Sequence, residues 1–235
     1  MKKVLFSFFL ALTYCFLANA QIIETSDLSV KEDCFGKWRV AVQAGPGFRI
    51  GKVQSGLGAD MDSFLRKLKK GYSLSADVTY YFLNVFGVGF KAQNYHASNS
   101  ANVQIQYNSG ERWIGTMTDK IDISFLGPFA SYRWQINKHS IILGSGLGYL
   151  HYKDKSYIGK SVSVNGGTLG LFSELNYDYS FTNRLAFGVS VSLISGSLSS
   201  VTTTIDGSRQ TSGTNSGQKE NISNIGISAG LRLNL

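Results

Sequence analysis

Hydrophobic and polar residues alternate with a period of two along most of the chain from Trp38 onward. In the first such segment Trp38, Val40 and Val42 share one parity, whereas Arg39 and Gln43 share the other. This alternation is typical of a β-strand with one apolar face. Further segments repeat the pattern, and we expect them at residues 72–82, 85–96, 121–134, 140–153, 168–179, 185–195 and 223–235.

The connections between these segments alternate in length. Residues 83–84, 136–139 and 180–183 form tight turns, whereas residues 52–71, 97–120, 154–163 and 196–220 form long polar connections. Strands of ~10–14 residues cross a bilayer when tilted, and short turns at one end with long loops at the other are typical of transmembrane barrels. We therefore predict an all-β fold, an eight-stranded antiparallel up-and-down transmembrane β-barrel.

Composition supports this fold class. Charged residues are 16% and aromatic residues 13% of the 235 residues, and 26 residues are glycine. The aromatic content argues against disorder, and two cysteines are too few for a disulfide scaffold. The polar parity consists mainly of small residues, which disfavours the alternative of a soluble exported barrel or sandwich.

The first twenty residues have the features of a secretory signal peptide. Lys2 and Lys3 precede an apolar stretch that ends in Ala18-Asn19-Ala20, a small-residue cleavage pattern. The expected organisation is a signal peptide at 1–20, a periplasmic N-terminal arm at 21–37 and an outer-membrane barrel at 38–235. Cleavage leaves 21 basic and 15 acidic residues, a net charge of +6. We expect an anionic membrane surface, not nucleic acid, to be the partner of this basic exported chain.

The polar parity carries charged residues that would face the barrel interior. We expect them to pair in a lumen network, because isolated buried charges are costly. The candidates are Arg39, Arg49, Asp77, Lys91, Asp122, Glu174, Asp178 and Arg232. Gly144, Gly146 and Gly148 would give these long side chains room. In the segment 121–134 the alternation predicts that Ile121, Ile123, Phe125 and Phe129 face lipid, with a bend or bulge at Pro128.

One short motif points to catalysis. His96 and Ser98 lie two residues apart, and therefore on one face of an extended strand. The segment His96-Ala97-Ser98-Asn99 resembles the His-x-Ser-Asn segment of outer-membrane lipid A deacylases. That resemblance implies His96 as base, Ser98 as nucleophile and Glu111 as the acid that orients the histidine. A polar loop start is the plainer interpretation.

A basic run follows the first strand. Arg66, Lys67, Lys69 and Lys70 are candidates for contact with lipopolysaccharide phosphates, on a short amphipathic helix over 60–70 or in a solvated loop. The histidines are scattered and show no metal-ligand spacing. We expect no metal and no cofactor.

The whole segment from Trp38 to Leu235 resembles the small bacterial outer-membrane β-barrel proteins of the Bacteroidota type, with an architecture similar to the OmpX and OmpW barrels. The segments that carry the resemblance are WRVAVQAGPGFRIGKV, GYSLSADVTYYFLNVFGVGF, LGPFASYRW, ILGSGLGYLHYKD and ISNIGISAGLRLNL. The resemblance implies a monomer inserted by the outer-membrane assembly machinery. We expect a structural or surface-interaction role without catalysis; the alternatives are a narrow channel for small solutes and a lipid A deacylase.

Overall fold

The computed structural model describes residues 36–51, 59–106, 112–157, 159–205, 208–213 and 220–235. The expected signal peptide, and the N-terminal arm up to residue 35, lie outside these ranges. Within them, no helix is long and apolar enough to cross a membrane.

Long antiparallel strands make up most of the described chain. They are β1 (Trp38–Arg49), β2 (Lys70–Tyr81), β3 (Phe86–Gln106), β4 (Arg112–Ile136), β5 (His139–Tyr157), β6 (Ser161–Ser180), β7 (Leu185–Ser195) and β12 (Asn224–Asn234). The shorter elements are the helix α2 (Ala59–Lys67) and the strands β8 (Ser197–Leu198), β9 (Ser200–Ile205), β10 (Ser208–Gly213) and β11 (Glu220–Asn221).

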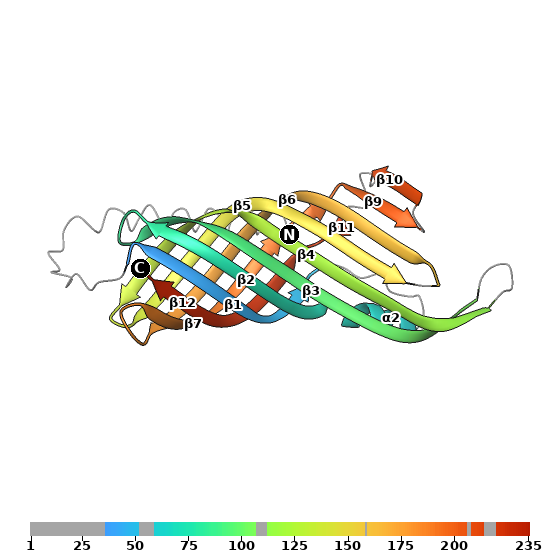
Figure 1. The fold of residues 1–235 in the computed structure, drawn as a ribbon, viewed down its shortest axis with the longest axis horizontal. Helices are drawn as coiled ribbons and strands as arrows, with labels where there is room; N and C mark the ends of the chain where they lie inside the picture. Colours follow the sequence, from blue (N-terminus) through green and yellow to red (C-terminus); the bar gives the residue numbers. More distant parts are fainter. Residues whose placement is uncertain (1–35, 52–58, 107–111, 158, 206–207, 214–219) are drawn as a thin grey trace. The chain divides into compact units, whose positions relative to one another are not determined.

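The eight long strands close into a ring because the first pairs with the last (Figure 1). β1 lies antiparallel to β12, with a register that runs from Arg39 opposite Asn234 to Arg49 opposite Asn224. The other pairs follow chain order from β1 to β7, and β7 pairs with β12. The eight-stranded up-and-down barrel predicted from the sequence is confirmed. Closure gives each long strand two hydrogen-bonded neighbours, which removes the free sheet edges that hydrocarbon does not tolerate.

The two ends of the barrel differ. Tight turns join β2 to β3, β4 to β5 and β6 to β7 at what we call the turn end, where β1 begins and β12 ends. At the opposite long end, β3, β4, β5 and β6 run on past the ring (Figure 1). Most of the segments 97–120 and 154–163, predicted as long loops, is therefore strand: β3 has 21 residues and β4 has 25, against 12 in β1. The β9–β10 hairpin extends this sheet through pairing of β9 with β6.

Outward side chains form an apolar band around the ring. Exposed aliphatic and aromatic residues occupy the outward positions, among them Val42, Leu74, Val88, Leu126, Leu147, Val189, Ile227 and Leu231. Aromatic residues lie at the margins of the band, with Trp38, Phe86, Trp134 and Tyr179 at the turn end and Phe48, Tyr72 and Tyr149 toward the long end. A band of this kind with aromatic girdles matches the lipid-facing surface of transmembrane barrels.

The predicted orientation of the segment 121–134 is wrong. Ile121, Ile123, Phe125 and Phe129 are buried in the barrel interior, from 1% to 8% exposed, and Pro128 lies on the outward face. No bulge occurs at Pro128, since β4 keeps one register with β3 on both sides of it. The prediction failed because both faces of β4 are apolar near its middle, so periodicity alone could not tell lipid from core.

The inward glycines of β5 make room for these aromatic rings. A Cβ atom on Gly148 would lie 2.7 Å from the ring of Phe125, and one on Gly144 would lie 3.4 Å from the ring of Phe129. The sequence pattern predicted that Gly144, Gly146 and Gly148 make room for long charged side chains. The glycines instead let phenylalanine rings approach the backbone of β5 closely.

Candidate functional site

A cluster of charged side chains fills the interior toward the turn end. Arg39 of β1 donates hydrogen bonds to Asp77 of β2 and Asp178 of β6, at 2.9 and 3.0 Å. Arg232 of β12 lies on the other side of Asp178, with 2.9 Å between its Nε and Oδ1 of the carboxylate. These contacts connect opposite walls of the barrel through side chains.

A second group of contacts continues the cluster toward the middle of the barrel. Lys91 Nζ lies 2.8 Å from Glu174 Oε2 and 3.7 Å from Asp77 Oδ1. The amide of Gln43 donates to Glu174 Oε1 at 2.6 Å, and its carbonyl oxygen accepts from Arg232 Nη2 at 2.6 Å. Gln43 is a neutral side chain that was absent from the predicted network. It thus links the contacts around Arg232 to those around Glu174.

The lumen network therefore has balanced charge. Six of the eight predicted residues lie together in it, namely Arg39, Asp77, Lys91, Glu174, Asp178 and Arg232. Three cations face three carboxylates, and all six residues are buried. Buried charges of this density are tolerated only when each has a partner.

An apolar core fills the interior between this network and the long end. It includes Phe125, Phe129, Leu150, Phe172 and Ile194 from the strands. The ammonium of Lys91 lies 4.9 Å from the centre of the Phe172 ring, so the network and the core are in contact.

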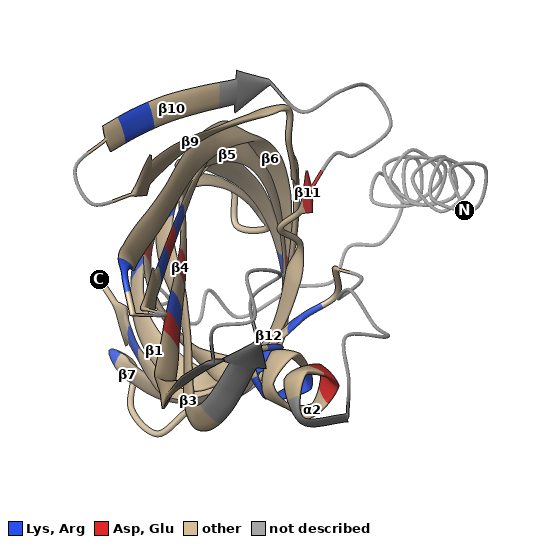
Figure 2. Cartoon of the chain, turned by 90° about the vertical axis from the view of Figure 1, so that its right-hand side faces the viewer, with Lys and Arg blue, Asp and Glu red and all other residues tan. Residues whose placement is uncertain are grey.

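The helix α2 packs against this core at the long end, at one side of the barrel beside β3 (Figure 2). Its Phe64 is 2% exposed and packs among the core residues, as does Leu68 just after the helix. Tyr95 of β3 donates to the carbonyl of Lys69 at 3.1 Å, and Asn99 donates to the carbonyl of Phe64 at 3.0 Å. The network, the core and the helix thus follow one another along the described part of the lumen.

A further inward cation, Arg133, was missed in the sequence and lies at the turn end. Arg133 stacks on the ring of Tyr81, 3.8 Å from its centre, and donates to the carbonyl of Asn84 at 3.1 Å. The alternation of Ser131 and Arg133 with the outward Tyr132 and Trp134 could have predicted that Arg133 points inward. The wrong orientation assigned to β4 prevented that prediction.

Arg49 lies apart from the lumen network. It contacts Glu220 at 3.5 Å and lies 5.7 Å from the ring centre of Tyr152, close to the long end. Its parity is inward as predicted, but it is too far along β1 to reach the other charges.

Asp122 does not face the lumen, and its predicted place in the network is wrong. Its side chain is 37% exposed on the outer face and lies 2.7 Å from Nδ1 of His96. The orientation of β4 explains the error, because Asp122 alternates with the buried Ile121 and Ile123.

His96 and Ser98 both point outward from β3, just beyond the apolar band. His96 is half-buried, stacks near Tyr72 with ring centres 5.1 Å apart, and has Asp122 directly opposite on β4. Ser98 is exposed and pairs across the strands with Lys120. No hydrogen bond joins Ser98 to His96 in the described part of the chain. Glu111, the acid that the resemblance implied, lies outside the described residues; Asp122 occupies the orienting position.

These residues belong to a wider polar collar on the outer face. We use this name for the outward residues of β3 to β6 beyond the apolar band: Asn94, His96, Ser98, Lys120, Asp122, Ser124, His151, Lys153, Lys155 and Asn165. Its basic residues outnumber its one carboxylate, Asp122.

The predicted basic run lies on α2 and the start of β2. Arg66, Lys67 and Lys70 are exposed at the long end and Lys69 is half-buried. The predicted amphipathic helix is present as Ala59–Lys67, but its apolar face packs into the barrel mouth.

Two carboxyl groups lie together inside the long end, beyond the apolar band. Asp119 of β4 is 6% exposed, and its carboxyl group interacts with that of Asp154 on β5. Tyr152 donates to the same Asp154 carboxyl at 3.1 Å. Burial and the neighbouring Asp119 raise the pKa of Asp154 to about 7. This pair was missed because both residues fell in predicted loops. The described residues contain no group of three or more histidine, cysteine or acidic side chains that could hold a metal ion.

Comparison with known proteins identifies the fold. No family model and no curated protein matches the chain. Among solved structures, a major outer membrane protein from Thermus thermophilus has a TM-score of 0.55 at 12% identity, and covers 84% of this chain and 99% of its own. Neisserial surface protein A has a TM-score of 0.52 at 13% identity, over 85% of this chain and 97% of its own. The outer membrane protein OprG from Pseudomonas aeruginosa has a TM-score of 0.51 at 13% identity, over 86% and 98%. The chain therefore has the fold of small bacterial outer-membrane β-barrels.

Removing one partner of a buried pair tests the lumen network. We predict that Glu174→Ala lowers the free energy of unfolding by about 3–5 kcal/mol, because Lys91 is left buried without its nearest carboxylate. The double variant Lys91→Met/Glu174→Met removes both charges and is expected to cost less than Glu174→Ala. Urea unfolding followed by tryptophan fluorescence measures both, and a double variant at least as destabilised as Glu174→Ala would contradict the pairing.

The carboxyl pair predicts a pH dependence at the long end. A folded-state pKa of about 7 for Asp154 exceeds the unfolded value, so the folded state binds more protons between about pH 4 and 7, and stability falls as pH rises through that range. Hydrogen exchange of the β4 and β5 amides beyond the apolar band is expected to accelerate about tenfold from pH 5 to 8, after correction for intrinsic rates. The variant Asp154→Asn is expected to lose this pH-dependent acceleration of hydrogen exchange. A wild-type profile identical to that of Asp154→Asn would rule out the coupling.

Proposed function

We propose that this protein is an outer-membrane barrel that does not conduct solutes and acts through its outer surface at the long end. The buried side chains of the interior carry this proposal, because the charge network, the apolar core and α2 occupy the lumen in succession. The fold and the apolar band support an outer-membrane location, with the turn end in the periplasm and the long end outside the cell. The Bacteroidota-type assignment, monomeric state and assembly-machinery partner rest on the sequence resemblance.

The exposed chemistry of the long end supports a surface role. The polar collar offers Lys120, Lys153 and Lys155, and α2 offers Arg66 and Lys67. Cations immediately above an apolar band favour anionic lipid headgroups, so lipopolysaccharide is the expected neighbour.

Planar bilayer recording tests whether ions pass through the lumen. Wild-type protein is expected to give no unitary current, because Lys91 and Glu174 close the path below the apolar core. The double variant Phe125→Ala/Phe172→Ala removes two rings from that core and serves as the comparison for leakage. Steady unitary currents from pure wild-type protein would overturn the proposal in favour of the channel alternative.

A second candidate function is the deacylation of a membrane lipid by Ser98, favoured by the 2.7 Å contact between His96 Nδ1 and Asp122. This contact leaves Nε2 of His96 as the free nitrogen, oriented by a carboxylate, as in hydrolases with a serine nucleophile. Ser98 Oγ would attack the ester carbonyl as its proton passes to His96. The tetrahedral adduct would release the lipid hydroxyl with that proton, and water would then cleave the acyl-serine to free fatty acid.

Lipid A mass spectrometry of expressing cells tests this second candidate. The wild type is expected to remove one acyl chain, Ser98→Ala to remove none, and Asp122→Asn to act at least ~100-fold more slowly. Ser100→Ala, the next outward serine of β3, is the matched control and is expected to behave as wild type. Unchanged lipid A from wild-type cells, or activity retained in Ser98→Ala, would eliminate the hydrolase.

A further inference from the structure

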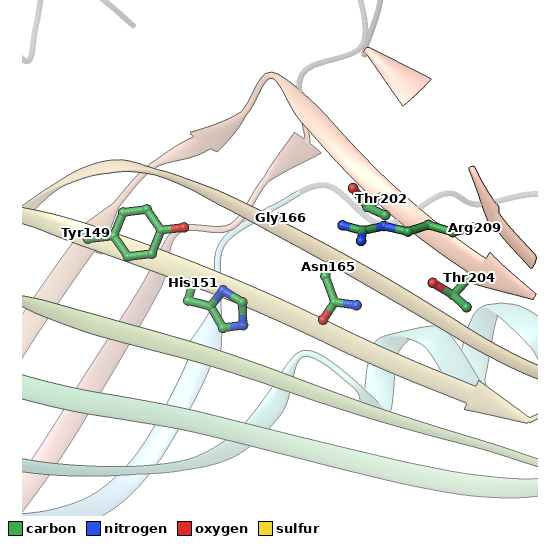
Figure 3. Close-up of a pocket in the computed structure, with 7 residues that line it drawn as sticks. All are labelled: Tyr149, His151, Asn165, Gly166, Thr202, Thr204 and Arg209. Atoms are coloured by element: carbon green, nitrogen blue, oxygen red, sulfur yellow. The ribbon is translucent and has the colours of Figure 1, made fainter. Parts of the chain in front are cut away.

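A polar groove lies on the outer face of β5, β6, β9 and β10 and shares His151 and Asn165 with the polar collar (Figure 3). It is lined by Tyr149, His151, Asn165, Gly166, Thr202, Thr204 and Arg209 and has a volume of about 460 Å³. This volume lies within the ~300–1,000 Å³ range of small-molecule sites. Neither the lumen network nor the His96 site uses any of these side chains.

Strand pairing puts the lining residues on one face. Asn165 of β6 pairs with Thr202 of β9, which pairs in turn with Thr211 of β10. The next row joins Thr204 to Arg209. Val164 and Val201, on the opposite face of the same strands, pack against the barrel core. The groove is therefore held by a sheet whose other face is anchored in the interior.

The chemistry of the groove fits an anion that also carries hydroxyl groups. Arg209 supplies a guanidinium, which binds phosphate or carboxylate through paired hydrogen bonds. In Figure 3 this guanidinium lies in the groove between Thr202 and Asn165. Threonine hydroxyls and an asparagine amide can both donate to and accept from sugar hydroxyls.

Positive charge continues from the groove onto the collar. Lys153 pairs across the strands with Asn165, and Lys155 pairs with Ser163, which in turn pairs with Thr204. The collar carboxylate, Asp122, is hydrogen bonded to His96. No ion pair neutralises Lys153, Lys155 or Arg209 in the described part of the chain.

One end of the groove lies at the margin of the apolar band. Tyr149 is the last aromatic residue of the band on β5 and is 55% exposed. Its hydroxyl lies over Gly167, where a Cβ atom would collide with it, so the glycine lets the phenol lie across β6. A tyrosine at this level sits at the boundary between hydrocarbon and headgroups, and its ring offers an apolar face to a sugar.

We propose that this groove binds a phosphorylated saccharide, either as the headgroup of an outer-leaflet glycolipid or as a free glycan. The proposal rests on the outer-surface role proposed above and names its ligand class. Arg209 binds the phosphate, Thr202, Thr204 and Asn165 bind the hydroxyl groups, and Tyr149 packs against the sugar ring.

Isothermal titration calorimetry of the full chain in a polyoxyethylene detergent, free of both sugar and phosphate, tests the proposal. The probes are a bisphosphorylated glucosamine disaccharide without acyl chains, the same disaccharide without phosphates, inorganic phosphate, and lipid A in mixed micelles. The bisphosphorylated disaccharide is expected to bind at least tenfold more tightly than either the unphosphorylated disaccharide or inorganic phosphate. Tighter binding of lipid A assigns the site to a lipid headgroup, and equal binding assigns it to a glycan.

Matched variants distinguish binding in the groove from non-specific attraction of the ligand to a basic protein. Arg209→Gln is expected to weaken binding of the bisphosphorylated disaccharide at least tenfold, and Gly167→Ala to weaken it by displacing Tyr149. Arg184→Gln removes the same charge from the turn between β6 and β7 at the opposite end, and is expected to bind as wild type. Native-like near-ultraviolet circular dichroism establishes that each variant is folded.

Three results would overturn the inference: no binding of the bisphosphorylated disaccharide or lipid A, equal binding of inorganic phosphate, or equal affinity in folded Arg209→Gln. Conductance is independent of these titrations. A silent bilayer with no saccharide binding would refute the groove alone, whereas channel currents with saccharide binding would refute only the sealed barrel.

Discussion

The pairing of β1 with β12 is the constraint on which the rest of the structure depends. Once Arg39 lies opposite Asn234 and Arg49 opposite Asn224, each long strand has two neighbours. Every side chain of the ring then faces either the enclosed lumen or the surroundings. An eight-stranded ring encloses just enough space for side chains to fill, so whatever points inward must pack, and any inward charge must find a partner.

The interior meets this requirement in two different ways along its length. Toward the turn end, Arg39 and Lys91 are matched by Asp77, Asp178 and Glu174. Farther along, phenylalanine rings and the apolar face of α2 pack into a buried apolar core. The outer surface also changes along the barrel, because the apolar band ends and the polar collar begins where β3 to β6 extend beyond the ring. Chemistry that could act on other molecules is therefore concentrated on the outer face at the long end.

The sequence predicted the residues whose neighbours alternate clearly. Glu174 and Asp178 stand among outward leucine and tyrosine, so their inward direction was readable from β6 alone. β4 was misread because its inward positions, such as Ile123 and Phe125, are as apolar as its outward ones. That single reversal placed Asp122 in the lumen. The partner of His96 then had to come from Glu111, because the orienting carboxylate is close only through the β3–β4 register.

Other features lay beyond periodicity. Gln43 joins the two halves of the charge network without carrying charge, and nothing in its local sequence distinguishes it from a space-filling polar residue. The groove depends on β9 pairing with β6 across more than thirty intervening positions, in a Ser/Thr-rich segment that has the composition of a loop. Non-local pairing creates both features, which is why the sequence pattern did not predict them.

The contacts of the interior imply that its charged side chains are sealed from water while the barrel wall faces lipid. Water-edited solid-state NMR of the protein in lipid bilayers tests it at the level of single side chains. We expect slow transfer of water magnetisation to Lys91 and Arg39 and fast transfer to the collar lysines Lys153 and Lys155. We also expect lipid acyl contacts at Val189. Transfer to Lys91 as fast as to Lys153 would show instead that the lumen is hydrated and the barrel is not sealed.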